Sequence, residues 1–359
     1  MIENLSINDL RKYLTTSQED KNVHKIDKYW VEKLIINVKK AMLSDEDKRR
    51  FSNFTSVQIV EKLQFFIEKD LLTKQEVLEL YCDKQEDSKK VIRIHKLNSD
   101  ISDCLNDINT KLEHKYGKNY FDKFNLVNNI QKKPTSTSKK LNLVYINKIS
   151  DSEYNLVFNY YLKWIEIIGQ NFETRVDYTP VVININTNNK LLQFRITKHK
   201  GFGKKTELTH SVNSIEDAFD CLKQEILSLL GITEADLNIF SIKNNVRNLF
   251  NNDILTKYEG VHKHNEGQTE VEVHFTIPVK SHGIDYTDLN IYKKIEDLKL
   301  DNSILLIKGS WNMDNANIKQ IFIHPEKIVF DVRKNEIQTL SSYTKSELNY
   351  ALSHITKNI

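Results

Sequence analysis

Cysteine, proline and glycine are scarce in this sequence, with three, four and nine residues among 359. Cys82, Cys104 and Cys221 lie far apart, and none belongs to a Cys-x-x-Cys pair. A disulfide framework and a zinc ribbon are therefore not expected, and a reducing, cytoplasmic compartment fits best. The low glycine and proline content, beside abundant lysine, asparagine and isoleucine, is typical of an AT-rich genome, so we expect a bacterial source.

The sequence also lacks a long apolar run. No stretch approaches the roughly 18 apolar residues of a membrane-spanning helix. The segment from Met1 to Arg11 has acids and asparagine where a signal peptide carries a basic flank and an apolar run. Export and membrane spanning are not expected. Hydrophobic residues still make up 39% of the chain, and the length fits two domains of roughly 100–200 residues each.

Neither sign of charge dominates. Lysine and arginine number 52 against 49 aspartates and glutamates, so the formal net charge is +3. A dedicated nucleic-acid-binding domain carries a larger basic excess, so any basic surface for a partner must be local. The motifs of P-loop, dinucleotide, calcium and zinc-protease sites and of the serine nucleophile elbow are absent from the sequence. We therefore expect no cofactor and no metal, and a non-catalytic protein rather than an enzyme.

The first third of the chain has helical periodicity. Between residues 7 and 120, apolar side chains recur at three- and four-residue steps, which places them on one face of each helix. Thr73 and Glu76 form a capping box before one run, and the last run covers residues 99–115. The pattern predicts a helical bundle over residues 1–128.

A polar segment then interrupts this pattern. Residues 131–140 read QKKPTSTSKK, with one proline, four hydroxyl residues and four lysines, as in a solvated linker. We place the linker at 129–140 and an α+β domain with an antiparallel or mixed sheet at 141–359. Whether that domain is divided near 244–267 stays open.

Beyond the linker, strands with period-two alternation are interspersed with amphipathic helices. A hairpin turns through residues 187–190, between strands over 181–185 and 191–196. Ser214 and Gly231 bound the best-defined helix. The other expected elements are strands over 141–146, 269–277, 304–307, 318–323 and 327–332, and helices over 152–168 and 344–355.

The most informative local feature is the segment KHKGFGKK, over residues 198–205. Lysines can neutralise phosphates, glycines let the backbone approach closely, and an exposed phenylalanine can stack on a base. We predict phosphate contacts for the four lysines and a base contact for the phenylalanine. These residues are Lys198, Lys200, Phe202, Lys204 and Lys205. The alternative is a solvated connection whose lysines keep the chain soluble.

Positive charge also occurs in the helical part of the chain. If its helices present Arg49, Arg50 and Arg93 on one side, these residues could follow a duplex backbone in the manner of a helix-turn-helix domain. The alternative is a set of solvated helix faces on which basic residues alternate with acids, as at residues 45–47.

A metal-dependent nuclease is a further hypothesis. Restriction-type nucleases bring carboxylates and a lysine to one metal ion at the scissile phosphate. Glu166, on an expected helix, and Asp177, before a strand, are the catalytic candidates. The following strand has Gln193 and Arg195 where this chemistry needs a carboxylate and a lysine, so we rank the hypothesis last.

A cluster of histidines does not change this ranking. His262, His264 and His274 are metal-ligand types, but no cysteine or aspartate stands at a matching spacing, and we assign no metal site. The sequence thus favours a non-catalytic nucleic-acid-binding protein, with DNA preferred over RNA, as part of a multi-protein assembly. The alternative is a protein–protein interaction subunit that does not contact nucleic acid. The oligomeric state stays open.

Overall fold

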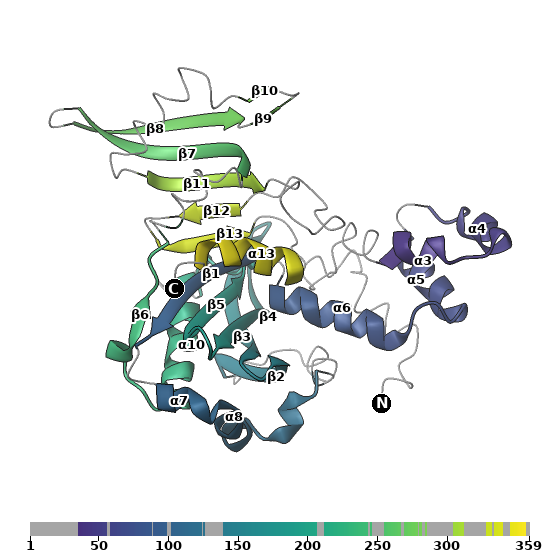
Figure 1. Cartoon of the computed structure of the whole chain (residues 1–359), viewed down its shortest axis with the longest axis horizontal. Coiled ribbons are helices and arrows are strands. Elements are labelled where there is room, and N and C mark those ends of the chain that lie inside the picture. The colour runs from purple at the N-terminus through teal and green to yellow at the C-terminus, as the bar shows by residue number, and fades with distance from the viewer. Residues whose placement is uncertain are drawn as a thin grey trace. The chain divides into compact units, whose positions relative to one another are not determined.

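The computed structural model describes residues 35–55, 58–87, 89–98, 102–123, 125, 139–206, 212–242, 245, 255–266, 269–278, 280–281, 284–285, 304–311, 328–331, 334–339 and 345–356. The chain divides into two compact units (Figure 1). The first unit comprises Met1–Lys84 and Ile318–His324, and the second comprises Gln85–Asn317 and Pro325–Ile359.

The described part of the first unit consists of short helices around an aromatic cluster. The helices are α3 (Asn37–Ala41), α4 (Asp45–Phe51), α5 (Ile59–Glu68) and the larger part of α6 (Lys74–Asp87). Phe51 stacks on Phe66 with ring centroids 5.0 Å apart, and Phe65 packs against both. The capping box expected at the start of α6 is confirmed, since Thr73 and Glu76 exchange backbone-to-side-chain hydrogen bonds.

The described residues of the second unit form an eleven-stranded sheet in which every pair of strands is antiparallel. Its order is β2-β3-β4-β5-β1-β13-β12-β11-β7-β8, and β6 pairs with β1. The strands are β1 (Lys90–Leu97), β2 (Leu141–Ser150), β3 (Glu153–Ile168), β4 (Asn171–Asn186), β5 (Leu191–Thr197), β6 (Leu237–Ile239), β7 (Leu255–Glu266), β8 (Thr269–Pro278), β11 (Ile304–Trp311), β12 (Ile328–Asp331) and β13 (Glu336–Thr339). The short strands β9 (Lys280–Ser281) and β10 (Ile284–Asp285) pair separately.

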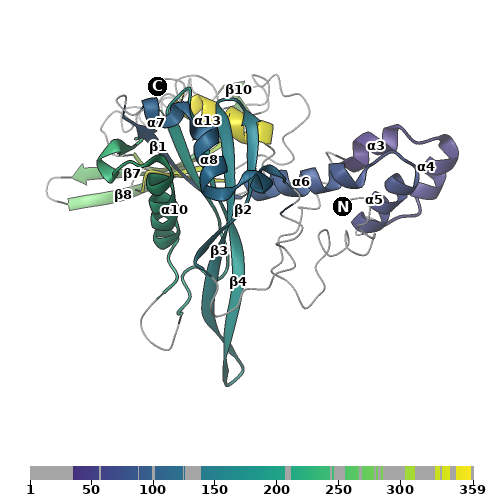
Figure 2. The same cartoon turned by 90° about the horizontal axis from the view of Figure 1, so that it is seen from below.

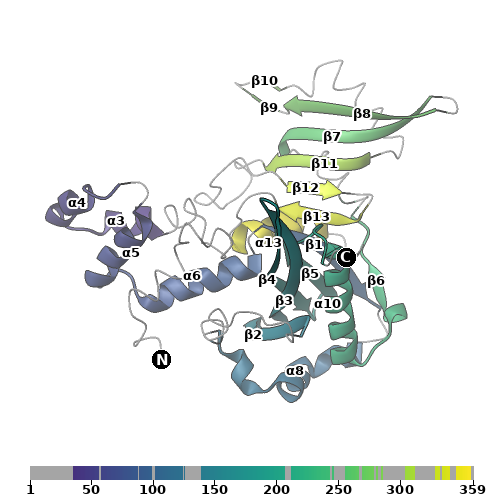
Figure 3. The ribbon, with the colours of Figure 1, turned by 180° about the vertical axis from the view of Figure 1, so that it is seen from behind.

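Helices cover both faces of this sheet (Figures 1 and 3). On one face lie α7 (Ser102–Asn106), α8 (Ile108–Tyr116) and α10 (Ile215–Leu230), whose apolar side chains join those of β3, β4 and β5 in one core. On the other face lies α13 (Lys345–Thr356). The 3-10 turns η3 (Lys118–Phe121) and η4 (Glu234–Asp236) complete the described elements. The core thus rests on a sheet that is buried on both sides over its central strands.

Several expectations from the sequence are confirmed. The chain mixes helices with an antiparallel sheet, and β4 and β5 form a hairpin through residues 187–190. Ser214 caps α10 by accepting a hydrogen bond from the Glu216 backbone N–H, and Gly231 ends this helix with φ 68°, a left-handed conformation that suits glycine. The C-terminal helix is present as α13.

The helix expected over residues 152–168 is wrong, because this segment is strand β3. It pairs with β4 from Glu153 to Ile168. Residues 154, 156, 158, 160, 162 and 164 belong to the core with α10, while Val157 on the opposite face is also buried. A strand buried on both faces has apolar residues at three- and four-residue steps as well as at two-residue steps, and this is why its pattern resembles a helix.

Two further expectations for the first 128 residues need correction. Residues 90–97, inside the stretch with helical periodicity, form the central strand β1 between β5 and β13. The helix expected over 99–115 is two helices, α7 and α8, which are separated at Asp107 and end at Gly117. The linker at 129–140 stays a prediction, because its residues up to 138 lie outside the described ones. The same holds for the strand over 318–323.

A buried polar network lies on the sheet face opposite α10. Glu86 accepts hydrogen bonds from the Tyr145 hydroxyl at 2.9 Å, from Asn147 at 2.9 Å and from Asn155 at 2.6 Å. Arg195, whose side chain is 2% exposed, pairs with Asp87 at 2.6 Å. Charged hydrogen bonds therefore connect the end of α6 to β2, β3 and β5.

Candidate functional site

The β3–β4 hairpin projects beyond its neighbours in the sheet (Figure 2). The described pairing of β2 with β3 reaches only to Tyr160, and β5 pairs with β4 only from Val181 onward. Residues 161–180 are therefore a two-stranded hairpin, which turns at Gly169 with φ 63°. The loop after β5 runs back along the open edge of β3, where the Ile165 N–H donates to the Lys205 carbonyl at 2.9 Å.

Hydrogen bonds and packing hold this loop in place. The Gly201 N–H donates to His199 Nδ1 at 3.0 Å, so the ring proton resides on Nε2, which donates to Asp177 Oδ2 at 3.1 Å. Gly201 lies so close to Trp164 that a Cβ there would be 2.9 Å from the indole. A glycine is therefore needed at this position for the loop to pack on β3.

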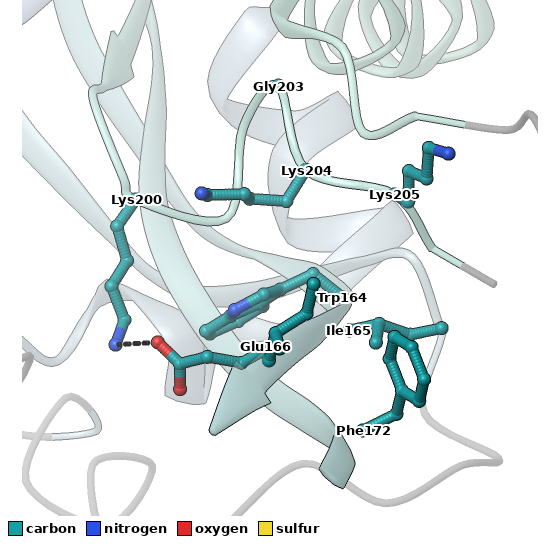
Figure 4. Close-up of a pocket in the computed structure, with 9 residues that line it drawn as sticks. Trp164, Ile165, Glu166, Phe172, Lys200, Gly203, Lys204 and Lys205 are labelled. Atoms are coloured by element: carbon teal, nitrogen blue, oxygen red, sulfur yellow. Dashed lines mark ion pairs between the residues drawn. The ribbon is translucent and has the colours of Figure 1, made fainter. Parts of the chain in front are cut away.

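A pocket of about 700 Å³ opens between the loop and the hairpin. Lys204 and Lys205 are exposed, and their ammonium groups form no ion pair with any residue that the structure describes. Lys200 lies 5.5 Å from the centre of the Trp164 ring and 3.6 Å from Glu166. Figure 4 shows the lysines on the loop above the strand residues. The pocket is lined by Trp164, Ile165, Glu166, Ile167, Phe172, Lys200, Gly203, Lys204 and Lys205.

One wall of the pocket is apolar and open to solvent. Phe172 and Ile167 pair across the hairpin, and they are 61% and 68% exposed. Ile168 and Val176 on the same hairpin are also large, exposed hydrophobic residues. Apolar groups that gather on a projecting hairpin, rimmed by charged residues, are typical of binding surfaces.

The carboxylate in the pocket is held ionised by its neighbours. Glu166 Oε2 accepts a hydrogen bond from Arg175 Nε at 3.0 Å, and this bond lowers the pKa of Glu166, with a smaller contribution from Lys200. Arg175 also pairs with Glu173 at 2.9 Å. At neutral pH the pocket therefore contains a negative charge among three lysines.

The structure brings together Lys200, Lys204 and Lys205 of the predicted residues, together with Glu166. Lys198 lies apart from them and donates a hydrogen bond to Gln338 on β13 at 2.7 Å. The base contact expected for Phe202 stays a prediction. Its ring is partly buried, packs against the core and stacks on Tyr160 with centroids 6.1 Å apart.

The predicted arginines belong to different units. Arg49 and Arg50 are exposed on α4 of the first unit. Arg93 is not on a helix, as had been expected, but on strand β1 of the second unit. Its guanidinium pairs with Glu336 at 2.6 Å and Glu216 at 2.7 Å and lies over the Phe219 ring. Two carboxylates thus neutralise Arg93, because a partly buried guanidinium needs such partners.

The nuclease candidates do not meet at one metal ion. Glu166 pairs with Glu173 in the hairpin register and Asp177 lies four residues further along β4, so the backbone positions of the two candidates are offset by roughly 13 Å along the strands. The Asp177 carboxylate already accepts a hydrogen bond from His199. The part of the chain that the structure describes contains no group of three or more His, Cys, Asp or Glu residues arranged to hold a metal ion.

The histidines considered as metal ligands lie on β7 and β8. The register pairs His262 with Val273 and His274 with Val261. Their side chains lie outside the described part of the structure.

Phe172 and Trp164 line the pocket but were not predicted as site residues from the sequence. Phe172 received no role, because residues 152–168 were assigned to a helix and the hairpin was not recognised. A usable signal was present, since Gly169 and Asn171 interrupt two long apolar-rich segments in the manner of a hairpin turn.

No protein-family model matches the chain, and no curated protein matches it. Among the described residues, no helix is both long and apolar enough to cross a membrane.

Proposed function

We propose that this protein binds nucleic acid, and that the pocket between the loop of residues 198–206 and the β3–β4 hairpin is its contact site. One observation carries the proposal. Two exposed lysines, Lys204 and Lys205, form no ion pair with any described residue and line the same pocket as the solvent-exposed ring of Phe172.

This combination matches the two chemical parts of a nucleotide. Ammonium groups neutralise phosphates and release their counterions, and this term supplies most of the sequence-independent affinity. An exposed aromatic ring offers a face on which a base can stack, which contributes about 1–3 kcal/mol per base. A pocket of about 700 Å³ also has a volume typical of ligand sites.

Hydrogen bonds within the protein hold the loop in place, and this favours binding. His199, Asp177 and Gly201 fix its start through hydrogen bonds at 3.0 and 3.1 Å. The Gly203 N–H and the Lys204 carbonyl fix its end by exchanging hydrogen bonds with the Asn213 backbone at 2.8 and 3.0 Å. A site that is already ordered loses less conformational entropy when it binds.

The proposal is tested by fluorescence anisotropy with labelled single- and double-stranded DNA and RNA. The variant is Lys204→Glu with Lys205→Glu, and the matched control is Lys118→Glu with Lys148→Glu, which makes the same charge change outside the pocket. We expect the pocket variant to bind at least about tenfold more weakly at moderate salt, because two phosphate contacts become repulsive. Equal affinities for parent and pocket variant would overturn the proposal.

Two additions to the same experiment test the other hypotheses. The double variant Arg49→Glu with Arg50→Glu tests whether the exposed guanidinium groups of α4 contribute to nucleic-acid binding. Mg²⁺ with gel analysis of the nucleic acid asks whether the protein cuts it, as the nuclease hypothesis requires.

A protein-interaction subunit is the second candidate. The exposed side chains of Ile167, Ile168, Phe172 and Val176 favour it, because such groups also form the centre of protein interfaces. If the parent protein binds none of the nucleic acids even at roughly 50 mM salt, where phosphate contacts are strong, this candidate replaces the first.

A further inference from the structure

The outer edge of β4 is open along the projecting part of the hairpin (Figure 2). The described pairing of β5 with β4 begins at Val181, and the residue before it is Pro180, which has no N–H to donate to a neighbouring strand. Residues 171–178 are exposed or half-buried. A strand edge with free N–H and C=O groups is a template on which a further strand can pair.

The register of the hairpin shows which backbone groups point to this open edge. On β3, the Ile165 N–H donates away from β4, to the Lys205 carbonyl. Residues directly opposite in an antiparallel pair direct their backbone groups either toward each other or away from each other. Thr174 is opposite Ile165, so the N–H and C=O groups of Thr174, and of Phe172 and Val176 on either side, point outward. Among the described residues, no other segment forms a hydrogen bond with these groups.

The side chains along this edge are complementary to a second copy of the same edge. If two copies run antiparallel with Thr174 opposite Thr174, Phe172 of each copy lies opposite Val176 of the other. These side chains are 61% and 38% exposed. On the other face of the strand, Glu173 lies opposite Arg175, and these side chains are 48% and 43% exposed. Aromatic side chains beside β-branched ones, opposite charges and paired threonines are all favourable cross-strand neighbours.

Other registers of the same edge are less favourable. A two-fold axis between neighbouring residues would place the free N–H groups opposite residues whose backbone groups already bond to β3. An axis at Glu173 or at Arg175 would place two like charges directly opposite each other. An axis at Val176 would require the Tyr178 N–H, which already donates to Asp177 Oδ1 at 2.8 Å. Charge and backbone direction together thus select Thr174 as the centre.

We infer that two copies of this chain form a dimer by pairing their β4 edges, antiparallel and centred at Thr174. The same patch is used on both copies, as in most two-fold dimers of soluble proteins. The pocket lies at the opposite edge of the hairpin, where the Lys205 carbonyl bonds to Ile165, so the two pockets lie at the outer edges of the joined sheet. Phe172 contributes to both surfaces. The inference does not rest on nucleic-acid binding.

Sedimentation velocity of the full-length protein over a concentration series tests the dimer. The parent should reach twice the mass of the chain. Thr174→Pro removes the central N–H without removing a hydrogen bond to β3, and should weaken association at least about tenfold, because each copy loses a bond at the two-fold axis. The matched control is Thr174→Val, which keeps the N–H and should associate as the parent does. Circular dichroism checks that both variants are folded.

A pair of charge reversals tests the register. Glu173→Arg places arginines opposite each other in a dimer, and Arg175→Glu places glutamates opposite each other. Each variant alone should associate at least about fivefold more weakly than the parent, because both cross-strand charge pairs become repulsive. An equimolar mixture of the two variants should form mixed dimers, because every arginine again lies opposite a glutamate.

Three results would overturn the inference. A parent that stays monomeric over the whole series would remove the dimer, and the open edge would then belong to a strand from another protein. Association of folded Thr174→Pro equal to that of the parent would place the contact on another surface. Two charge variants that are monomeric alone and remain so when mixed would exclude the register centred at Thr174.

Discussion

Two clusters of charged side chains in the second unit use similar residue types and differ in what surrounds them. In the buried network, Glu86 accepts hydrogen bonds from three side chains and Arg195 pairs with Asp87 at 2.6 Å. In the pocket, Lys204 and Lys205 face solvent without an acidic partner among the described residues. The charges of the first cluster are paired with other residues of the protein, whereas the ammonium groups of Lys204 and Lys205 are exposed to solvent.

This difference has an energetic consequence. Burying a charge costs several kcal/mol unless a partner is close, so the buried network can exist only because its charges are paired. An exposed ion pair such as Glu166 with Arg175 contributes roughly 0–1 kcal/mol, so the charged residues of the pocket are not required by the fold. Substitutions in the network should therefore affect stability, and substitutions in the pocket should affect binding.

The largest expected effect is on stability. Arg195→Met removes the guanidinium that pairs with Asp87 and should lower the free energy of unfolding by about 3–5 kcal/mol, because a buried carboxylate loses its charge partner. Arg175→Met, which removes an exposed partner of Glu166, should change it by no more than about 1 kcal/mol. Urea denaturation measures both. Similar losses of unfolding free energy in the two variants would contradict the distinction between the buried network and the exposed pocket.

Substitutions of two phenylalanines test the same distinction between stability and binding, with an expected effect of intermediate size. Phe202→Ala should cost about 1–3 kcal/mol of stability, because the ring is partly buried against Tyr160 and the core. Phe172→Ala should leave the melting temperature nearly unchanged and weaken the binding of single strands. If Phe202→Ala instead weakens binding with no loss of stability, the base contact belongs to Phe202.

The smallest expected effect is a pH dependence from Lys90. Its side chain donates hydrogen bonds to the Gln85 carbonyl and the Thr197 hydroxyl, and burial lowers its pKa from 10.5 to about 7. Between these two values the unfolded chain binds a proton that the folded chain does not, so the free energy of unfolding should rise with pH. The slope from this group is at most about 1.4 kcal/mol per pH unit.

Denaturation of parent and Lys90→Met from pH 7 to pH 9 isolates this contribution. Tyrosines titrate near pH 10 in the unfolded chain, and the comparison with the variant removes what both proteins share. The parent should gain stability relative to Lys90→Met as the pH rises. A difference that stays constant with pH would show that Lys90 is charged in the folded protein.

The two clusters also show how far the sequence could be interpreted. The lysine-rich loop was found because four lysines around Gly-Phe-Gly stand out locally, and the caps of α6 and α10 were found because capping depends on nearby residues. The apolar residues of the β3–β4 hairpin that line the pocket were not predicted. Strand β3 is buried on both faces over much of its length, so its sequence pattern resembles a helix.

Long-range partners could not be derived from periodicity at all. Arg93 and Glu336 are separated by 243 residues, and Arg195 and Asp87 by 108. Their pairing follows from the order of the strands, in which β1 lies between β5 and β13. A charged residue in the sequence could therefore be recognised, but whether it was buried and paired or exposed and available depended on the sheet topology.

The central claim is that Lys204 and Lys205 contact phosphates, and the salt dependence of binding tests it most directly. The association constant of a single strand should be measured over a salt series for the parent and for Lys204→Glu with Lys205→Glu. We predict that the slope of log K against log salt is smaller in magnitude by about two in the variant, roughly one for each lysine. Parallel lines for the two proteins would contradict the claim.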